Sequence, residues 1–234
     1  MTAQPSMPDE SSAVVAIPVF DIGQKEYRAA WDYQLAVHAD VLDGRYPDGA
    51  IILVEHPAVV TIGRHPGSHR HLLADEALLR QLGVAVVETD RGGDITFHGP
   101  GQLVAYPIIP LNSYNLRIHD YIRMLERVVI KTLADFSLPA LCQSGATGVW
   151  VQSRRLSPPE TAKICALGIK LRRWISLHGI ALNVTTDLSF FNLINPCGLG
   201  RPVTSLASEL IHPPDMDEVK DHLVRHLRAA LAAK

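Results

Sequence analysis

The sequence predicts an α+β fold with a single core. Predicted strands outnumber predicted helices, and the two do not alternate regularly as they would in a doubly wound sheet. No internal repeat or linker interrupts the 234 residues, a length that one domain can fill. We therefore expect a polar, disordered tail over residues 1–12 and one domain over residues 13–234.

Three amphipathic helices are predicted from apolar residues that recur at helical spacing. The first covers residues 25–42 and carries Tyr27, Ala30, Trp31, Leu35 and Val41. The second, over residues 118–136, has the most regular period, and the third covers about residues 217–232.

Strands are predicted where short apolar runs end at turn residues. In chain order they occupy residues 14–20, 50–55, 59–62, 84–88, 102–109, 148–151, 163–171 and 175–184. The last two meet at Arg172 and Arg173, which suits a hairpin tip in water. Residues 152–162 hold two prolines and no apolar period, which predicts a mobile surface loop, either a lid or partner-contact loop or a tolerated insertion.

Composition and charge exclude several classes of protein. A net charge of −2 gives no basic face for nucleic acid. No apolar run approaches the roughly 20 residues that span a bilayer, and the polar N-terminus is no signal peptide. Three widely spaced cysteines suit free thiols in a reducing compartment, so we expect a cytoplasmic protein.

The first unusual segment is RGGDITFHGPGQ, residues 91–102. Gly92 and Gly93 can take positive φ and let the backbone approach a ligand, and His98 precedes a Gly-Pro-Gly turn. A double turn with a structural histidine is an equally good interpretation of the glycines. The segment is no phosphate loop, because GxxxxGK[ST] and GxGxxG are both missing from it.

The second segment is KICALGIKLRRWISLHGIALNV, residues 163–184. Its strands contain small residues, which mark places where a ligand or another backbone comes close: Ala166, Gly168, Gly179 and Ala181. Lys163 alone is weak evidence, because a lysine at a strand start usually points into solvent. His178 and Asn183 are more simply interpreted as sheet residues with satisfied hydrogen bonds.

The third segment is INPCGLG, residues 194–200. Cys197 lies between a proline and a glycine, which is typical of a thiol presented on a turn as a nucleophile. Cys142 and Cys165 lie among apolar residues and are expected to be buried small hydrophobes. No protease signature and no zinc-ligand spacing accompanies any cysteine, and His69 and His71 fit a polar loop before a helix.

Six sequence pieces in one order over about 115 residues carry a family resemblance: RGGDITFHGPGQLVAYPI, GVWV, KICALGI, HGIALNV, NPCGL and VTSL. Together they resemble the lipoyl(octanoyl) transferases of lipoate biosynthesis. The resemblance implies the mixed-sheet α+β catalytic domain of the biotin and lipoate protein ligases. It implies that Cys197 is the nucleophile and that Lys163 lowers the pKa of its thiol. The implied acyl-binding residues are Arg91, Gly92, Gly93, Asp94, Ile95, Thr96, Phe97, His98, Ala166, Leu167, Gly168, Gly179, Ile180 and Ala181.

The resemblance also implies an activity and its partners. Octanoyl would pass from octanoyl-acyl carrier protein through a cysteine thioester to a lysine on lipoyl domains of 2-oxoacid dehydrogenase complexes and the glycine cleavage H protein. No nucleotide, metal or other cofactor is expected, because the donor thioester is already activated. Two rivals stay open, an ATP-dependent lipoate or biotin ligase and a non-catalytic acyl-binding module. In this sequence Cys165 places a second thiol close to Lys163, and the loop at 152–162 is longer than the family pattern.

Overall fold

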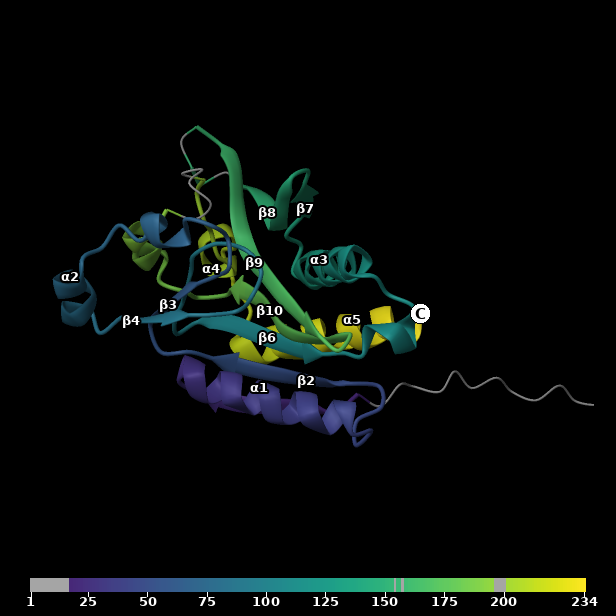
Figure 1. The fold of residues 1–234 in the computed structure, drawn as a ribbon. Helices are drawn as coiled ribbons and strands as arrows, with labels where there is room; N and C mark the ends of the chain where they lie inside the picture. The colour runs from purple at the N-terminus through teal and green to yellow at the C-terminus, as the bar shows by residue number, and fades with distance from the viewer. Residues whose placement is uncertain (1–16, 154, 157, 196–200) are drawn as a thin grey trace, which may run out of the picture.

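The computed structural model describes residues 17–153, 155–156, 158–195 and 201–234, and it contains two sheets flanked by helices (Figure 1). The seven strands of the large sheet lie in the order β1 (Val19–Gln24), β2 (Ala50–Glu55), β6 (Gln102–Ile108), β10 (Ile175–Asn183), β9 (Glu160–Arg172), β8 (Ala146–Ser153) and β7 (Ala140–Gln143). The small sheet has the order β4 (Ala85–Glu88), β3 (Val59–Ile62) and β5 (Thr96–His98). Each sheet has one parallel pair, β1 with β2 and β3 with β4, so the predicted α+β class with mixed sheets is confirmed.

Helices cover both faces of the large sheet. On one face, α3 (Ile118–Asp135) and α5 (Met216–Ala232) bury residues such as Leu125 and Leu223 in the main core. On the other face, α1 (Tyr27–Leu42) buries Ala30 and Val37 in a second core (Figure 1). The shorter helices are η1 (Ser68–His71), α2 (Glu76–Gln81), η2 (Leu111–Tyr114), η3 (Leu188–Leu193) and α4 (Leu206–Glu209). In the part of the chain that the structure describes, no helix is long and apolar enough to cross a membrane.

Most predicted elements are confirmed to within a few residues, including α1, β2, β3, α3 and α5. The first strand is an exception: β1 covers Val19–Gln24, so the predicted strand is confirmed at Val19 and Phe20, while residues 14–16 lie outside the described residues. These bounds are set by pairing with β2 and not by the apolar run. The pairs extend from Val19 opposite Ile51 to Gln24 opposite Glu55. The sequence does not predict the short strands β5 and β7, and α2 is the helix expected after His69 and His71.

The predicted loop at 152–162 is also wrong in its extent. β8 continues to Ser153 and β9 begins at Glu160, with Gln152 opposite Thr161. Cross-strand pairing therefore orders polar residues that have no apolar period, and only residues 154–159 lie between the strands. The hairpin predicted at Arg172 and Arg173 is confirmed one residue later: Arg173 and Trp174 form its tip, and both have positive φ, 52° and 61°, as a type I′ turn requires.

A β-bulge in β9 decides which side chains share a face. Trp150 of β8 lies opposite Lys163 and Val149 lies opposite Cys165, so Ile164 is an extra residue on β9. Ile164 and Cys165 both enter the core beneath α3 and α5. Because the bulge shifts the alternation by one, Lys163 shares the opposite face with Ala166, although the two lie three positions apart, an odd number.

Candidate active site

A cavity of about 280 Å³ lies on the face of the large sheet that carries Lys163. β6, β8, β9 and β10 contribute one side of it, and residues 91–96 cross over them. The crossing is held where the Gly92 N–H donates to the Ile169 carbonyl at 3.0 Å. The volume is near the lower end for small-ligand pockets, about 300 Å³.

The structure brings most of the predicted binding residues to this cavity. Those that line it are Arg91, Gly93, Asp94, Ile95, Thr96, His98, Ala166, Leu167, Gly168, Gly179, Ile180 and Ala181. Gly92 and Phe97 are not in its lining: Gly92 bonds to β9, and Phe97 stacks on Phe190 at 4.9 Å in the core of the small sheet. Binding by any of these residues stays a prediction.

Two glycines of the lining are required by neighbouring backbone. A Cβ on Gly179 would lie 2.1 Å from the Ala105 carbonyl oxygen on β6. A Cβ on Gly168 would lie 2.8 Å from the Gly92 carbonyl oxygen. Small strand residues were expected where a ligand or another backbone comes close. For both of these glycines the close group is a neighbouring backbone.

Lys163 lies in the cavity wall, half-buried, with Nζ 4.7 Å from the centre of the Trp150 ring. Its backbone pairs with the segment after NPCGL: the Lys163 N–H donates to the Pro202 carbonyl, and the Thr204 N–H donates to the Lys163 carbonyl, both at 2.9 Å. On the other side of NPCGL, the Asn195 N–H donates to the His71 carbonyl at 2.7 Å. Cys197 itself lies outside the described residues.

The other two cysteines lack the environment of an activated thiol. Cys165 is fully buried in the main core, and burial raises the pKa of its thiol to about 12. Cys142 is exposed, which contradicts its expected burial, because the short edge strand β7 leaves it uncovered. Partial burial and the nearby carboxylate of Glu126 raise the pKa of Cys142.

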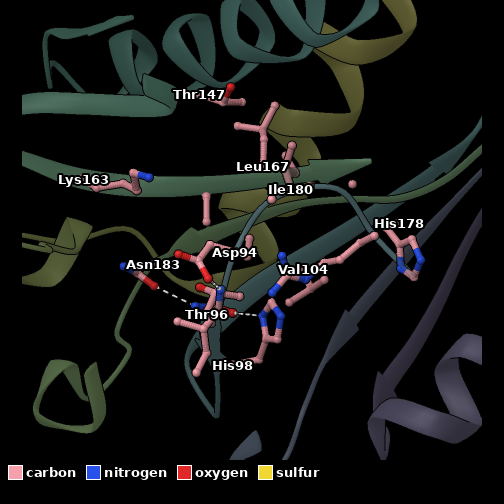
Figure 2. A pocket seen from close by; sticks show the side chains of 18 of the residues that line it. Asp94, Thr96, His98, Val104, Thr147, Lys163, Leu167, His178, Ile180 and Asn183 are labelled. Atoms are coloured by element: carbon pink, nitrogen blue, oxygen red, sulfur yellow. Dashed lines mark hydrogen bonds between the residues drawn. The ribbon is translucent and has the colours of Figure 1, made fainter. Parts of the chain in front are cut away.

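A chain of hydrogen bonds joins three of the sequence motifs (Figure 2). Since the Gln102 Oε1 can only accept, His98 Nδ1–H donates to it at 2.7 Å. Gln102 Nε2 donates to Asn183 Oδ1 at 2.8 Å, and Asn183 Nδ2 donates to the Thr204 carbonyl at 2.9 Å. Burial lowers the pKa of His98 well below its ordinary value, so the chain is neutral and fixes HGPGQ against HGIALN and VTSL.

Buried polar contacts also fix the ends of the crossing segment. Arg91 donates to the Thr61 carbonyl and hydroxyl at 2.8 and 2.9 Å. Asp94 accepts from the Ile95 N–H at 2.8 Å and lies 2.6 Å from His71 Nδ1. Burial would raise the pKa of Asp94, but hydrogen bonds including those from Ser68 and Ile95 hold that pKa below its usual value.

Several lining residues were not predicted as site residues. Gln102 and Trp150 lie within the quoted motifs HGPGQ and GVWV, so the resemblance contained a signal for them. His178 and Asn183 have the hydrogen bonds that were expected, and both also line the cavity. Tyr27 was counted as an apolar residue of α1, and no motif marks it.

Solved structures of ligases share this fold. A lipoate-protein ligase A bound with ATP superposes with a TM-score of 0.72 over 92% of this chain and 85% of that one, at 17% identity. A putative lipoate protein ligase from T. acidophilum with bound lipoic acid gives a TM-score of 0.68 over 92% and 86%, also at 17% identity. These likenesses show the architecture alone.

Sequence comparison identifies the family. Residues 26–228 match the lipoyl protein ligase A/B catalytic domain. The chain is 42% identical to an octanoyltransferase of Cytophaga hutchinsonii over 92% of both chains, and 40% identical to one of Flavobacterium johnsoniae over 90% of this chain and 94% of that one. The protein therefore belongs to the lipoyl protein ligase A/B catalytic-domain family and, within it, to the octanoyltransferases.

Proposed function

We propose that this octanoyltransferase moves the octanoyl group of octanoyl-acyl carrier protein to a lysine of a lipoyl domain through a thioester on Cys197. The observation that carries the proposal is the position of Lys163. It lies in the wall of the cavity and is hydrogen-bonded through its backbone to the segment that follows NPCGL. A cation there favours the thiolate form of a neighbouring cysteine, which is the nucleophilic form.

The two remaining cysteines support the assignment by their surroundings. Cys165 lies on the core side of the β9 bulge, and Cys142 lies beside a carboxylate. Both thiols have raised pKa values, which disfavours the thiolate. Cys197 lies in the sequence between Asn195 and Pro202, whose backbones are hydrogen-bonded to His71 and Lys163.

The reaction has two balanced steps. The Cys197 thiolate attacks the donor carbonyl carbon, a new C–S bond forms, and the carrier thiol leaves with the electron pair of the broken C–S bond. The acceptor amine then attacks the Cys197 thioester, an amide C–N bond forms, and the Cys197 thiolate leaves while the amine loses a proton. The first step exchanges like bonds, and the second is strongly downhill, so the donor thioester supplies all the energy.

The acceptors we propose are lipoyl domains of 2-oxoacid dehydrogenase complexes and the glycine cleavage H protein. This first step of protein lipoylation would take place in the cytoplasm. An ATP-dependent ligase of the same fold is the competing function, and it would leave Cys197 without a role.

Intact mass spectrometry tests the proposal directly. The protein incubated with octanoyl-acyl carrier protein, chelator and no nucleotide is expected to gain one octanoyl mass, and a lipoyl domain added afterwards is expected to remove it. Cys197→Ala should abolish the adduct, whereas Cys142→Ala and Cys165→Ala should retain it. Adduct formation by Cys197→Ala, or transfer that strictly requires ATP, would contradict the proposal.

A further inference from the structure

Three aromatic side chains form a wall at the far end of the cavity from Lys163. His178, Tyr27 and Tyr106 line the cavity and are buried, with 1%, 3% and 3% of their surface exposed. Figure 2 shows Lys163 and His178 at opposite ends, with Leu167, Ile180 and Val104 between them. His178 lies opposite Ile169 on β9, six residues from Lys163, which is roughly 20 Å along a strand.

His178 has a backbone conformation that is rare inside a strand. Its φ is +59°, in the left-handed region, although its neighbours pair regularly with β9. Leu182, four residues further along β10, packs in the core beneath α3 and α5, whereas the His178 ring lies 5.6 Å from Trp31 on α1. The left-handed conformation thus turns the imidazole from the core face to the cavity face, at a cost in backbone strain.

A hydrogen bond to a partly exposed carboxylate holds the buried ring in this orientation. His178 Nε2–H donates to Asp90 Oδ1 at 2.7 Å, and the His178 N–H donates to Gln34 Oε1 at 2.8 Å. Asp90 also forms an ion pair with Lys170. Burial alone would raise the pKa of Asp90, but hydrogen bonds from Lys170 and His178 hold that pKa below its usual value.

The tyrosines of the wall are fixed by partners outside the cavity. His56 Nδ1–H donates to the Lys25 carbonyl at 2.7 Å, so His56 Nε2 accepts from the Tyr106 hydroxyl at 2.7 Å. Tyr27 packs on His56 with ring centres 5.1 Å apart, and its hydroxyl lies 3.5 Å from His178 Nδ1. An intruding group could not part these rings without breaking buried hydrogen bonds.

We propose that this wall stops the end of the acyl chain and thereby sets the longest chain that the enzyme transfers. The proposal rests on the proposed function, in which the thioester carbon lies at the Lys163 end. An octanoyl chain extends toward His178, and the wall excludes longer chains because their extra methylenes have no room. Asp90 is a positioning residue, since it acts through His178 and is absent from the cavity lining.

Replacing His178 by glycine tests the effect of the wall apart from that of the other residues of the site. His178→Gly removes the ring and also relieves the left-handed strain, because glycine adopts φ > 0 freely. The matched control is Asn115→Gly, which relieves the same kind of backbone strain at an exposed residue outside the cavity. Asn115 is also left-handed, with φ +51°. The measurement is kcat/KM with hexanoyl, octanoyl, decanoyl and dodecanoyl carrier-protein donors, with a thermal melt for each variant.

We expect His178→Gly to raise the dodecanoyl-to-octanoyl ratio of kcat/KM by about tenfold or more, the effect of a methylene in a fitted pocket, while Asn115→Gly leaves it unchanged. Asp90→Ala, at a partly exposed residue, should shift the ratio in the same direction. If His178→Gly does not fold, Asp90→Ala is the variant that tests whether the wall limits chain length. An unchanged ratio in the folded variant would overturn the wall as a limit. Failure of the parent protein to transfer any acyl group would instead overturn the proposed function, and the wall's role with it.

Discussion

Lys163 is the residue whose surroundings depart most from what its type and position in the sequence suggest. A lysine near the start of a strand usually points into solvent, yet Lys163 lines the cavity, packs its ammonium over Trp150, and bonds through its backbone to Pro202 and Thr204. Arg201 lies over the same ring at 5.3 Å, so the positive charge around Trp150 is concentrated at this end of the cavity.

We expect Lys163→Ala to raise the pH at which Cys197 is alkylated, toward the ordinary thiol pKa of about 8.5, and to slow acyl transfer. The reason is that a cation within about 4–6 Å stabilises the thiolate. The measurement is the pH profile of iodoacetamide labelling at Cys197, read by peptide mass spectrometry. Lys170→Ala is the control for the labelling profile, because Lys170 pairs with Asp90 seven residues along the same strand. Identical labelling profiles with and without Lys163 would refute the pairing of Lys163 with Cys197. They would not contradict the role of Cys197 as the nucleophile.

At the scale of elements, the bulge in β9 brings Lys163 to the cavity. If Ile164 were part of a regular strand instead of a bulge, strict alternation would place Lys163 and Ala166 on opposite faces of the sheet. Gly148 of β8 lies against this bulge with φ +130°, and a Cβ there would come 2.8 Å from the Cys165 carbonyl oxygen and 3.2 Å from Lys163 Cε. The glycine therefore leaves the space that the Lys163 side chain occupies.

Gly148→Ala is expected to destabilise the protein by about 1–3 kcal/mol and to displace the Lys163 side chain. Chemical denaturation gives the change in the free energy of unfolding, and single-turnover acyl transfer shows the displacement. Gly44→Ala is the matched control, since Gly44 also has positive φ, +80°, but a Cβ there meets nothing within 4 Å. Equal losses of stability and of transfer rate in the two variants would contradict a displacement of Lys163. They would show that backbone strain from the positive φ is the whole effect of Gly148→Ala.

At the scale of the whole molecule, buried imidazoles couple folding to pH. His56, His98 and His178 lie close together, with the rings of His56 and His98 5.8 Å apart. Burial lowers the pKa of all three, to about 4 for His56. Above about pH 6.5 these histidines are neutral in the folded and unfolded states alike, so stability is complete there.

As pH falls from about 6.5 to about 4, His56 binds a proton in the unfolded chain but stays neutral in the folded protein, so the free energy of unfolding decreases. For His56 alone the loss is about 3 kcal/mol. We expect the thermal midpoint to fall over this range, and less steeply in His56→Gln, whose amide keeps hydrogen bonds without titrating. His119→Gln, at an exposed residue of α3, should keep the slope of the parent. A parent-like slope in His56→Gln would mean that other groups cause the acid sensitivity.

The sequence by itself determined the α+β class, the main helices and strands, and the family. Periodic apolar positions and short apolar runs are local signals, and helices such as α3 follow them closely. Motif residues in one order carried the resemblance, and the family comparison confirmed it. From the same motifs came most of the cavity lining, because RGGDITFH and the small residues of β9 and β10 lie together there.

Only the tertiary structure decided how those residues act on one another. The exposure of Cys142, the bulge that turns Lys163 to the cavity, and the left-handed His178 all depend on neighbours distant in sequence. Tyr27 reaches the cavity from α1, and Gly179 is small because the backbone of β6 lies against it. Local propensity carries no information on such contacts, since strand register and packing between layers place them.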